Sequence, residues 1–173
     1  MARWPESWKC SKTVDTQVRL QDLGKRVAVF AIPGAFTPTC SAKHLPGFVA
    51  QKDRIKAAGV DAIVCVSVND PFVMKAYGKQ AAPAEAESKE IRFLADTSGE
   101  LGRRLGMLFD ATAALGGERW RRANLLVEDG VIKYVEAETG GAYTKTGATQ
   151  FLHDALGDSE APTTEFDPVV VAP

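Results

Sequence analysis

The sequence lacks several features that mark particular classes of protein. None of its 173 residues lies in an apolar run of 18 or more, so we expect no segment that spans a bilayer. Its only histidines, His44 and His153, are too few and too far apart for a zinc site. The 21 basic and 22 acidic residues leave a net charge of -1, which gives no bulk attraction to nucleic acid or to anionic membranes. We therefore expect no metal, no nucleic-acid partner and no membrane association.

Cysteine is also scarce. The three cysteines, Cys10, Cys40 and Cys65, are odd in number and form no C-x-x-C motif, which argues against a secreted disulfide framework. Free thiols of this kind are typical of a reducing compartment. Residues 1–12 contain no apolar core of a secretory signal. The expected compartment is the cytoplasm, with an organelle entered through a removed targeting segment as the alternative.

The length and the 45% of hydrophobic residues fit a single globular domain, which we assign to residues 1–160, followed by a tail at 161–173. Two short apolar runs rich in β-branched residues predict buried strands, and the amphipathic stretch between them predicts a helix, which together make a parallel βαβ unit. An Asp-Gly pair between two later strand patterns predicts a hairpin. This order predicts an α/β, thioredoxin-like fold with a mixed sheet flanked by helices. The predicted strands are 26–32, 61–68, 91–94, 123–127 and 131–135, the helices lie near 45–55, 71–77, 101–105 and 148–156, and 81–89 is expected to be solvated loop or helix end.

Residues 33–41 (PGAFTPTCS) carry the chemical interest, because they connect the first strand to the first helix. Functional sites gather at the carboxyl ends of strands in such sheets. If Thr37 is the N-cap, Pro38 falls at the first helical position and Cys40 at the third, where its backbone N–H can donate to the Thr37 hydroxyl. The sulfur then faces free N–H groups and the positive end of the helix dipole, which favours thiolate over thiol.

A helix terminus alone supplies only about 0.3–1 kcal/mol of this stabilisation, so a reactive Cys40 requires a nearby cation. The arginines Arg119, Arg121 and Arg122 precede the predicted strand 123–127, which should neighbour the first strand. Its entry would then bring an arginine to Cys40. The alternative is a buried, inert cysteine behind a well-capped helix, and the residues alone leave the two interpretations evenly matched.

Three segments resemble a known family: PGAFTPTC at 33–40, SAKHLPGF at 41–48 and VCVSVNDPFVMKAY at 64–77. They are similar to the type-II (peroxiredoxin-5-like) peroxiredoxins, which are thiol peroxidases on a thioredoxin fold, and the similarity runs from about residue 27 to 156. The resemblance implies that Cys40 is the peroxidatic cysteine and that Arg122 is the catalytic arginine. It implies catalytic roles for Pro33, which shields the cysteine, and Thr37, whose hydroxyl meets the thiolate and the peroxide. Thr39 and Gly34 are expected to bind the substrate.

The resemblance implies an enzyme that reduces hydrogen peroxide and alkyl hydroperoxides through a cysteine sulfenic acid, without a metal or organic cofactor. Cys65 is the candidate resolving cysteine, as in plant members. Lys145 stands where other members carry a late resolving cysteine. We therefore favour reduction by glutaredoxin with glutathione, or by thioredoxin. The alternative is a redox sensor or holdase of the same fold that passes its oxidation to a partner; such a protein is oxidised once and does not turn over.

The remaining expectations concern assembly and packing. Family members associate around the peroxidatic helix, and Phe36, Phe72 and Phe109 are expected near that face, so we predict a homodimer. We expect His44 to pack beneath the active-site turn more readily than to take part in catalysis. Pro46 predicts a helix kink where its missing N–H loses the bond to residue 42. Residues 1–16 lack the family's usual opening, which predicts a shortened or rearranged first hairpin, and Cys10 receives no role.

Overall fold

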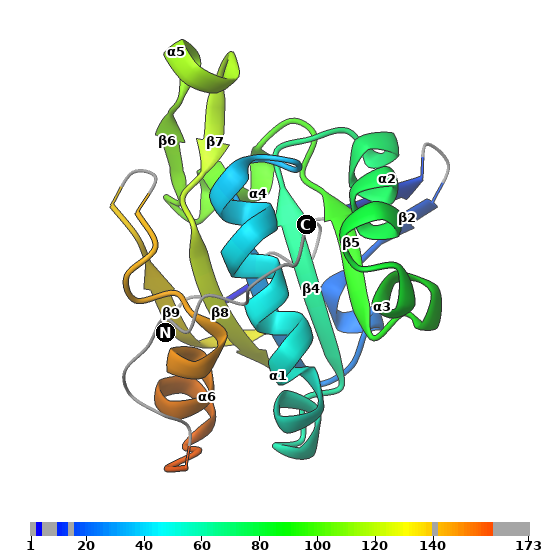
Figure 1. The fold of residues 1–173 in the computed structure, drawn as a ribbon, viewed down its shortest axis with the longest axis vertical. Coiled ribbons are helices and arrows are strands. Elements are labelled where there is room, and N and C mark those ends of the chain that lie inside the picture. The colour runs from blue at the N-terminus through cyan, green and yellow to red at the C-terminus, as the bar shows by residue number, and fades with distance from the viewer. Residues whose placement is uncertain (1–2, 5–9, 14–15, 140–141, 161–173) are drawn as a thin grey trace.

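A computed structural model describes residues 3–4, 10–13, 16–139 and 142–160. The order of strands in the main sheet is β2-β1-β5-β4-β3-β8-β9. Its centre is parallel, and an antiparallel pair lies at each edge (Figure 1). This confirms the α/β, thioredoxin-like architecture expected from the sequence. The strands are β1 (Cys10–Thr13), β2 (Thr16–Val18), β3 (Arg26–Ala31), β4 (Ala62–Ser67), β5 (Ile91–Ala95), β8 (Ala123–Glu128) and β9 (Val131–Ala137).

Helices cover the sheet, and each face of the sheet has its own core. Alternate residues of a strand point to opposite faces. On β3, Ala28 and Phe30 join the cluster beneath α1, α2 and α6, whereas Val27 and Val29 join the cluster that contains Leu101 of α4. Both cores are closed to solvent. The helices are α1 (Leu45–Ala57), α2 (Pro71–Ala81), α3 (Pro83–Ser88), α4 (Glu100–Arg104), α5 (Thr112–Leu115) and α6 (Ala148–Leu156), with a 3₁₀ turn at Leu20–Asp22.

Local chain signals set two of the turns as predicted. Asp129 and Gly130 have φ values of 47° and 74°, so both central residues of the β8–β9 turn are in the left-handed region that a tight hairpin turn requires. Gly157 ends α6 with φ of 72°. The β1–β2 pair is short and contains an irregularity, in line with the shortened opening that we expected.

The predictions for the connecting segments were incomplete at two places. Most residues of 81–89 are exposed and Ala81 ends α2, as expected, but residues 83–88 form a separate helix, α3, whose Glu85 is buried and lies 3.7 Å from Lys52. A second, two-stranded sheet of β6 (Leu108–Asp110) and β7 (Glu118–Trp120), with α5 between its strands, was not predicted at all. Its strands are too short to show a period. This hairpin projects at the top of Figure 1.

The predicted tail at 161–173 lies outside the described residues. Within the described ranges, no helix is long and apolar enough to cross a membrane.

Candidate active site

The helix that carries Cys40 begins at Pro38, the first helical position predicted from the sequence. After the two helical residues Pro38 and Thr39, the chain forms a π-helix over Cys40–His44, and the N–H of Leu45 donates to the Cys40 carbonyl. Pro46, in the first turn of α1, has no N–H to donate to residue 42, which explains why the predicted irregularity lies here. Single π turns of this kind are common at functional sites.

The hydrogen bond predicted between the Thr37 hydroxyl and the Cys40 N–H is not formed. The hydroxyl instead donates to the Gly34 carbonyl over 2.9 Å. The first bond of the helix is made by backbone atoms, from Ser41 N to Thr37 O at 3.0 Å. Because the Gly34 carbonyl lies within hydrogen-bond distance of the Thr37 hydroxyl, Thr37 stabilises the loop. It does not bond the Cys40 N–H.

Asn69 anchors the loop in front of Cys40, a role that the sequence analysis missed. Its side-chain oxygen accepts from the Ala35 N–H at 3.0 Å and from the Ser67 hydroxyl at 2.8 Å. The next loop residue, Phe36, is held at φ of 64°, a conformation that costs energy for a bulky residue. Its ring lies edge-on to Tyr77, with the centroids 5.1 Å apart. The loop is therefore tied to the end of β4 and to α2.

The other predicted site residues lie in this loop or beside it. Pro33 and Gly34 are buried, whereas Thr39 is partly exposed. A Cβ atom at Gly34 would lie 3.0 Å from the Thr37 methyl group and 4.0 Å from an Arg119 nitrogen. Arg119 itself donates to the Val68 carbonyl at 2.8 Å, so it links the β6–β7 hairpin to the end of β4. It makes no hydrogen bond to Cys40 among the described contacts.

Arg122 is the arginine that reaches Cys40. It precedes β8, which pairs with β3, and its guanidinium Nη1 lies 3.4 Å from Cys40 Sγ. Its Nε donates to the Ala142 carbonyl at 3.0 Å, and the Tyr143 ring lies 5.6 Å from the guanidinium carbon. Arg122 and Cys40 are 2% and 0% exposed. This guanidinium is the nearby cation that the sequence analysis required for a reactive Cys40.

His44 also contacts the guanidinium, a contact that the sequence analysis did not foresee. Its ring lies edge-on to both Phe30 and Phe48, which stack on each other, as expected for a histidine packed beneath the turn. Its Nδ1, however, lies 3.4 Å from Arg122 Nη1, and its Nε2 lies 3.2 Å from Asn124 Oδ1. Burial and then the charge of Arg122 lower the pKa of His44 to about 3, so the ring is neutral.

Glu138 holds the segment that meets Arg122 from the other side. Its buried carboxylate accepts hydrogen bonds from backbone N–H groups and hydroxyls of residues 144–146. Burial raises its pKa, but the bonds from Lys145 and Thr144 outweigh burial and bring it down to about 2. The same segment supplies Ala142, Tyr143 and the Thr146 carbonyl that accepts from Asn124. None of these partners could be identified without the tertiary structure.

Cys65 lies in the middle of β4, paired in register with Phe30 on one side and Phe93 on the other. It is fully buried, and burial followed by the proximity of Cys40 raises the pKa of its thiol well above the ordinary value. Both cysteines are free thiols and share one core cluster. The side chain of Cys10 lies outside the described residues.

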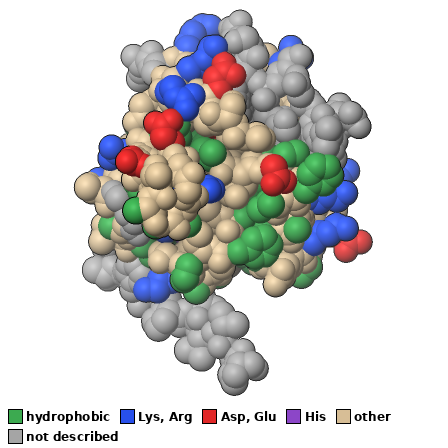
Figure 2. Space-filling model, turned by 90° about the horizontal axis from the view of Figure 1, so that it is seen from above, with side chains coloured by type: hydrophobic (Ala, Val, Ile, Leu, Met, Phe, Trp, Pro, Cys, Tyr) green, Lys and Arg blue, Asp and Glu red, His purple; other side chains and the backbone are tan. Residues whose placement is uncertain are grey.

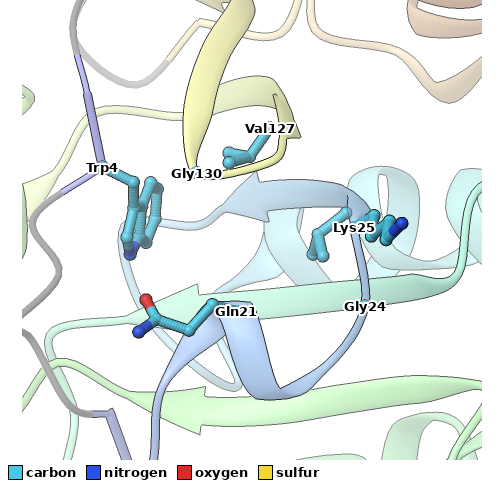
Figure 3. A pocket seen from close by; sticks show the side chains of 7 residues that line it. Trp4, Gln21, Gly24, Lys25, Val127 and Gly130 are labelled. Atoms are coloured by element: carbon cyan, nitrogen blue, oxygen red, sulfur yellow. The ribbon is translucent and has the colours of Figure 1, made fainter.

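No group of three His, Cys, Asp or Glu side chains in the described part of the chain is arranged to hold a metal ion. A separate hollow of about 10 Å³ lies away from Cys40, at the start of β3 and the end of β8. Trp4, Gln21 and Lys25 are among the residues that line it (Figure 3). It has room for about one water molecule, so it is no substrate pocket.

Comparison with known proteins agrees with this geometry. Residues 9–152 match the Redoxin family. The chain is 46% identical to peroxiredoxin-2B of Arabidopsis thaliana over 129 residues. The aligned part covers 75% of this chain and 77% of the relative. The reduced Prx3 structure from Vibrio vulnificus is 37% identical with a TM-score of 0.79, covering 90% of this chain and 96% of that one. Peroxiredoxin 5 of Alvinella pompejana is 34% identical with a TM-score of 0.71, covering 79% and 87%. The chain therefore belongs to the peroxiredoxins, the thiol peroxidases of the Redoxin family, in their type-II branch.

Proposed function

We propose that this peroxidase works through Cys40 as the peroxidatic cysteine, with Arg122 as the cation that activates it. The observation that carries the proposal is the 3.4 Å separation of Arg122 Nη1 from Cys40 Sγ. Arginine stays charged at any physiological pH, so its field acts on the sulfur throughout the reaction. We expect the start of the helix to add the positive end of its dipole near the same atom.

In the proposed reaction, the Cys40 thiolate attacks the terminal oxygen of hydrogen peroxide or an alkyl hydroperoxide. A sulfur–oxygen bond forms while the oxygen–oxygen bond breaks, and the leaving oxygen takes a proton and departs as water or an alcohol. Cys40 becomes a sulfenic acid. Arg122 and the N–H groups of Thr39 and Cys40 stabilise the charge that develops on the two oxygens.

The loop residues have supporting parts in this proposal. Pro33 shields the sulfur from water, and Gly34 and Thr39 line the path of the peroxide. Thr37 orients the loop through its bond to Gly34 and offers its hydroxyl oxygen to the incoming peroxide. The tight space at Gly34 supports this arrangement, because a side chain there would press on Thr37.

An external thiol is proposed to reduce the sulfenic acid. One thiol forms a mixed disulfide with Cys40 and releases water, and a second thiol frees Cys40 and leaves as a disulfide. The burial of Cys65 within β4 supports this route over an internal disulfide. Lys145 lies where a late cysteine would be expected and pairs with Glu136 at 2.5 Å. Glutaredoxin with glutathione is the favoured reductant, and thioredoxin is the alternative.

The decisive experiment is peroxide consumption with glutaredoxin and glutathione, set against thioredoxin and its reductase. Continuous turnover with the glutathione system supports the proposal. A single round of oxidation without turnover would favour the redox sensor instead. Cys40→Ser should abolish consumption, and Cys10→Ser, its matched control, should retain it. Retained activity in Cys40→Ser would overturn the assignment.

We further propose a homodimer formed through the face around the peroxidatic helix. Phe36 and Phe72 are 48% and 66% exposed, a high value for large apolar side chains. The view from above in Figure 2 shows hydrophobic side chains gathered on one side of this end of the molecule. Phe109, the third predicted aromatic, is only partly exposed in β6.

We propose the cytoplasm as the compartment, because the sequence has an odd number of cysteines and both described ones are free thiols. Some relatives carry names that place them in the chloroplast or the mitochondrion. Fractionation of the source cells tests this point.

A further inference from the structure

The contacts of His44 have only one consistent set of hydrogen positions. A guanidinium group has donors and no acceptor, so at 3.4 Å from Arg122 Nη1 the His44 Nδ1 atom must be the acceptor. The proton of the neutral ring is therefore on Nε2, which lies 3.2 Å from Asn124 Oδ1. The Asn124 amide is oriented in the same sense, because its Nδ2 donates to the Thr146 carbonyl at 2.9 Å. The chain of bonds runs from Arg122 through His44 and Asn124 to Thr146.

This series of hydrogen bonds ends at Arg122 Nη1, the nitrogen that contacts Cys40 Sγ. Arg122 Nη1 carries two N–H groups, and its two partners are Cys40 Sγ and His44 Nδ1. The Nε atom is held separately by the Ala142 carbonyl. Because Arg122, His44 and Asn124 are all buried, an N–H that lost its partner would have no water to replace it.

We propose that His44 and Asn124 are positioning residues, which hold Arg122 Nη1 against Cys40 by presenting one fixed acceptor to its second N–H. Asn124 Oδ1 accepts from His44 Nε2 and so keeps the ring proton there. The unprotonated Nδ1 then holds the guanidinium of Arg122 in place. The proposal rests on the proposed roles of Cys40 and Arg122. It goes beyond them, since neither His44 nor Asn124 touches the sulfur in this arrangement.

The competing explanation is that His44 only fills space against the edges of Phe30 and Phe48. Two substitutions separate the explanations. His44→Phe keeps an aromatic ring in the core but removes the acceptor. His44→Asn loses ring volume but keeps an amide oxygen near the place of Nδ1. A packing role therefore favours the phenylalanine variant, whereas a positioning role favours the asparagine variant.

The measurements are the rate constant for peroxide reduction and the fraction of Cys40 present as thiolate, followed by its ultraviolet absorbance across pH. We expect His44→Phe to lower the rate constant by about 10- to 100-fold, because a misplacement of about 1 Å can cost about 100-fold, and to lower the thiolate fraction at neutral pH. His44→Asn should recover much of both. His153→Phe, a change at a partly exposed histidine of α6, is the matched control and should leave both unchanged.

Asn124→Leu gives a second test that does not alter the ring. Nitrogen-15 NMR of the His44 imidazole should report the proton on Nε2 in the parent protein and a changed tautomer population in the variant, with a lower rate constant. Thermal unfolding confirms that each variant is folded. Arg122→Ala is measured beside them: if it retains full rate, the proposed function itself fails. If Arg122→Ala loses activity while folded His44→Phe and Asn124→Leu retain the parent rate and thiolate fraction, only the positioning role is overturned. It is equally overturned if His44→Asn falls below His44→Phe.

Discussion

Glu138 Oε1 lies 3.0 Å from both the backbone nitrogen and the hydroxyl oxygen of Thr146. The same carboxylate also accepts from the backbone of Thr144 and Lys145. One buried charge therefore orders the whole segment whose carbonyls receive Arg122 and Asn124. We therefore expect Glu138 to affect both the stability of the fold and the position of Arg122.

The first prediction is a pH dependence that comes from Glu138. Its pKa is about 2 in the folded protein, below the ordinary value of 4.5, so its stabilising contribution is present above 4.5 and is lost as the pH falls toward about 2. Glu138→Gln should lower the free energy of unfolding at neutral pH, and the difference from the parent should shrink through that acid range. Urea unfolding at a series of pH values measures it. A difference that is independent of pH would contradict the prediction.

The second prediction compares two arginines. Arg122→Ala should lower the rate constant for peroxide reduction by about 100- to 1,000-fold, the usual cost of losing one preorganised donor at a developing charge. It should also lower the thiolate fraction of Cys40. Arg119→Ala, the matched control, should do far less, because Arg119 bonds the carbonyl of Val68 and not the sulfur. Stopped-flow kinetics and thiolate titration give both values. The reverse order of effects would show that the wrong arginine is assigned.

The third prediction concerns Cys65. Reaching Cys40 would require loss of part of the first helical turn, a cost on the order of a few kcal/mol. After one equivalent of peroxide without reductant, mass spectrometry should therefore find a sulfenic acid on Cys40. Cys65→Ser should keep at least partial turnover with glutaredoxin. Rapid and complete formation of a Cys40–Cys65 disulfide would instead make this a two-cysteine enzyme.

The fourth prediction concerns the exposed aromatics. Light scattering at micromolar concentration should give twice the chain mass of 18.6 kDa. Phe72→Ser should shift the population toward the monomer, because Phe72 is the more exposed of the two aromatics. Val135→Ser, at an exposed position on β9, is the control and should leave the mass unchanged. A parent protein of 18.6 kDa would count against the dimer.

Local sequence patterns were sufficient for most of the fold. Apolar runs marked the central strands, Asp129-Gly130 marked the hairpin, and Gly157 marked the end of α6, because each depends on neighbours along the chain. The pattern failed for β6 and β7, whose three-residue strands are too short to show alternation. It also missed that the largely exposed segment 83–88 is a separate helix, α3, with Glu85 buried.

The candidate site was likewise predicted in part from the sequence and in part decided by the tertiary structure. The motif around Cys40 and the position of Arg122 at the head of a strand were readable from the sequence, since the motif is continuous and the pairing of that strand with β3 follows from the topology. The Thr37 bond to Gly34, the contact of His44 with Arg122, and the bracing by Glu138 were decided only by the tertiary structure. Each depends on which acceptor comes within about 3 Å of a given donor, a distance that the packing of remote segments determines and that residue spacing does not encode.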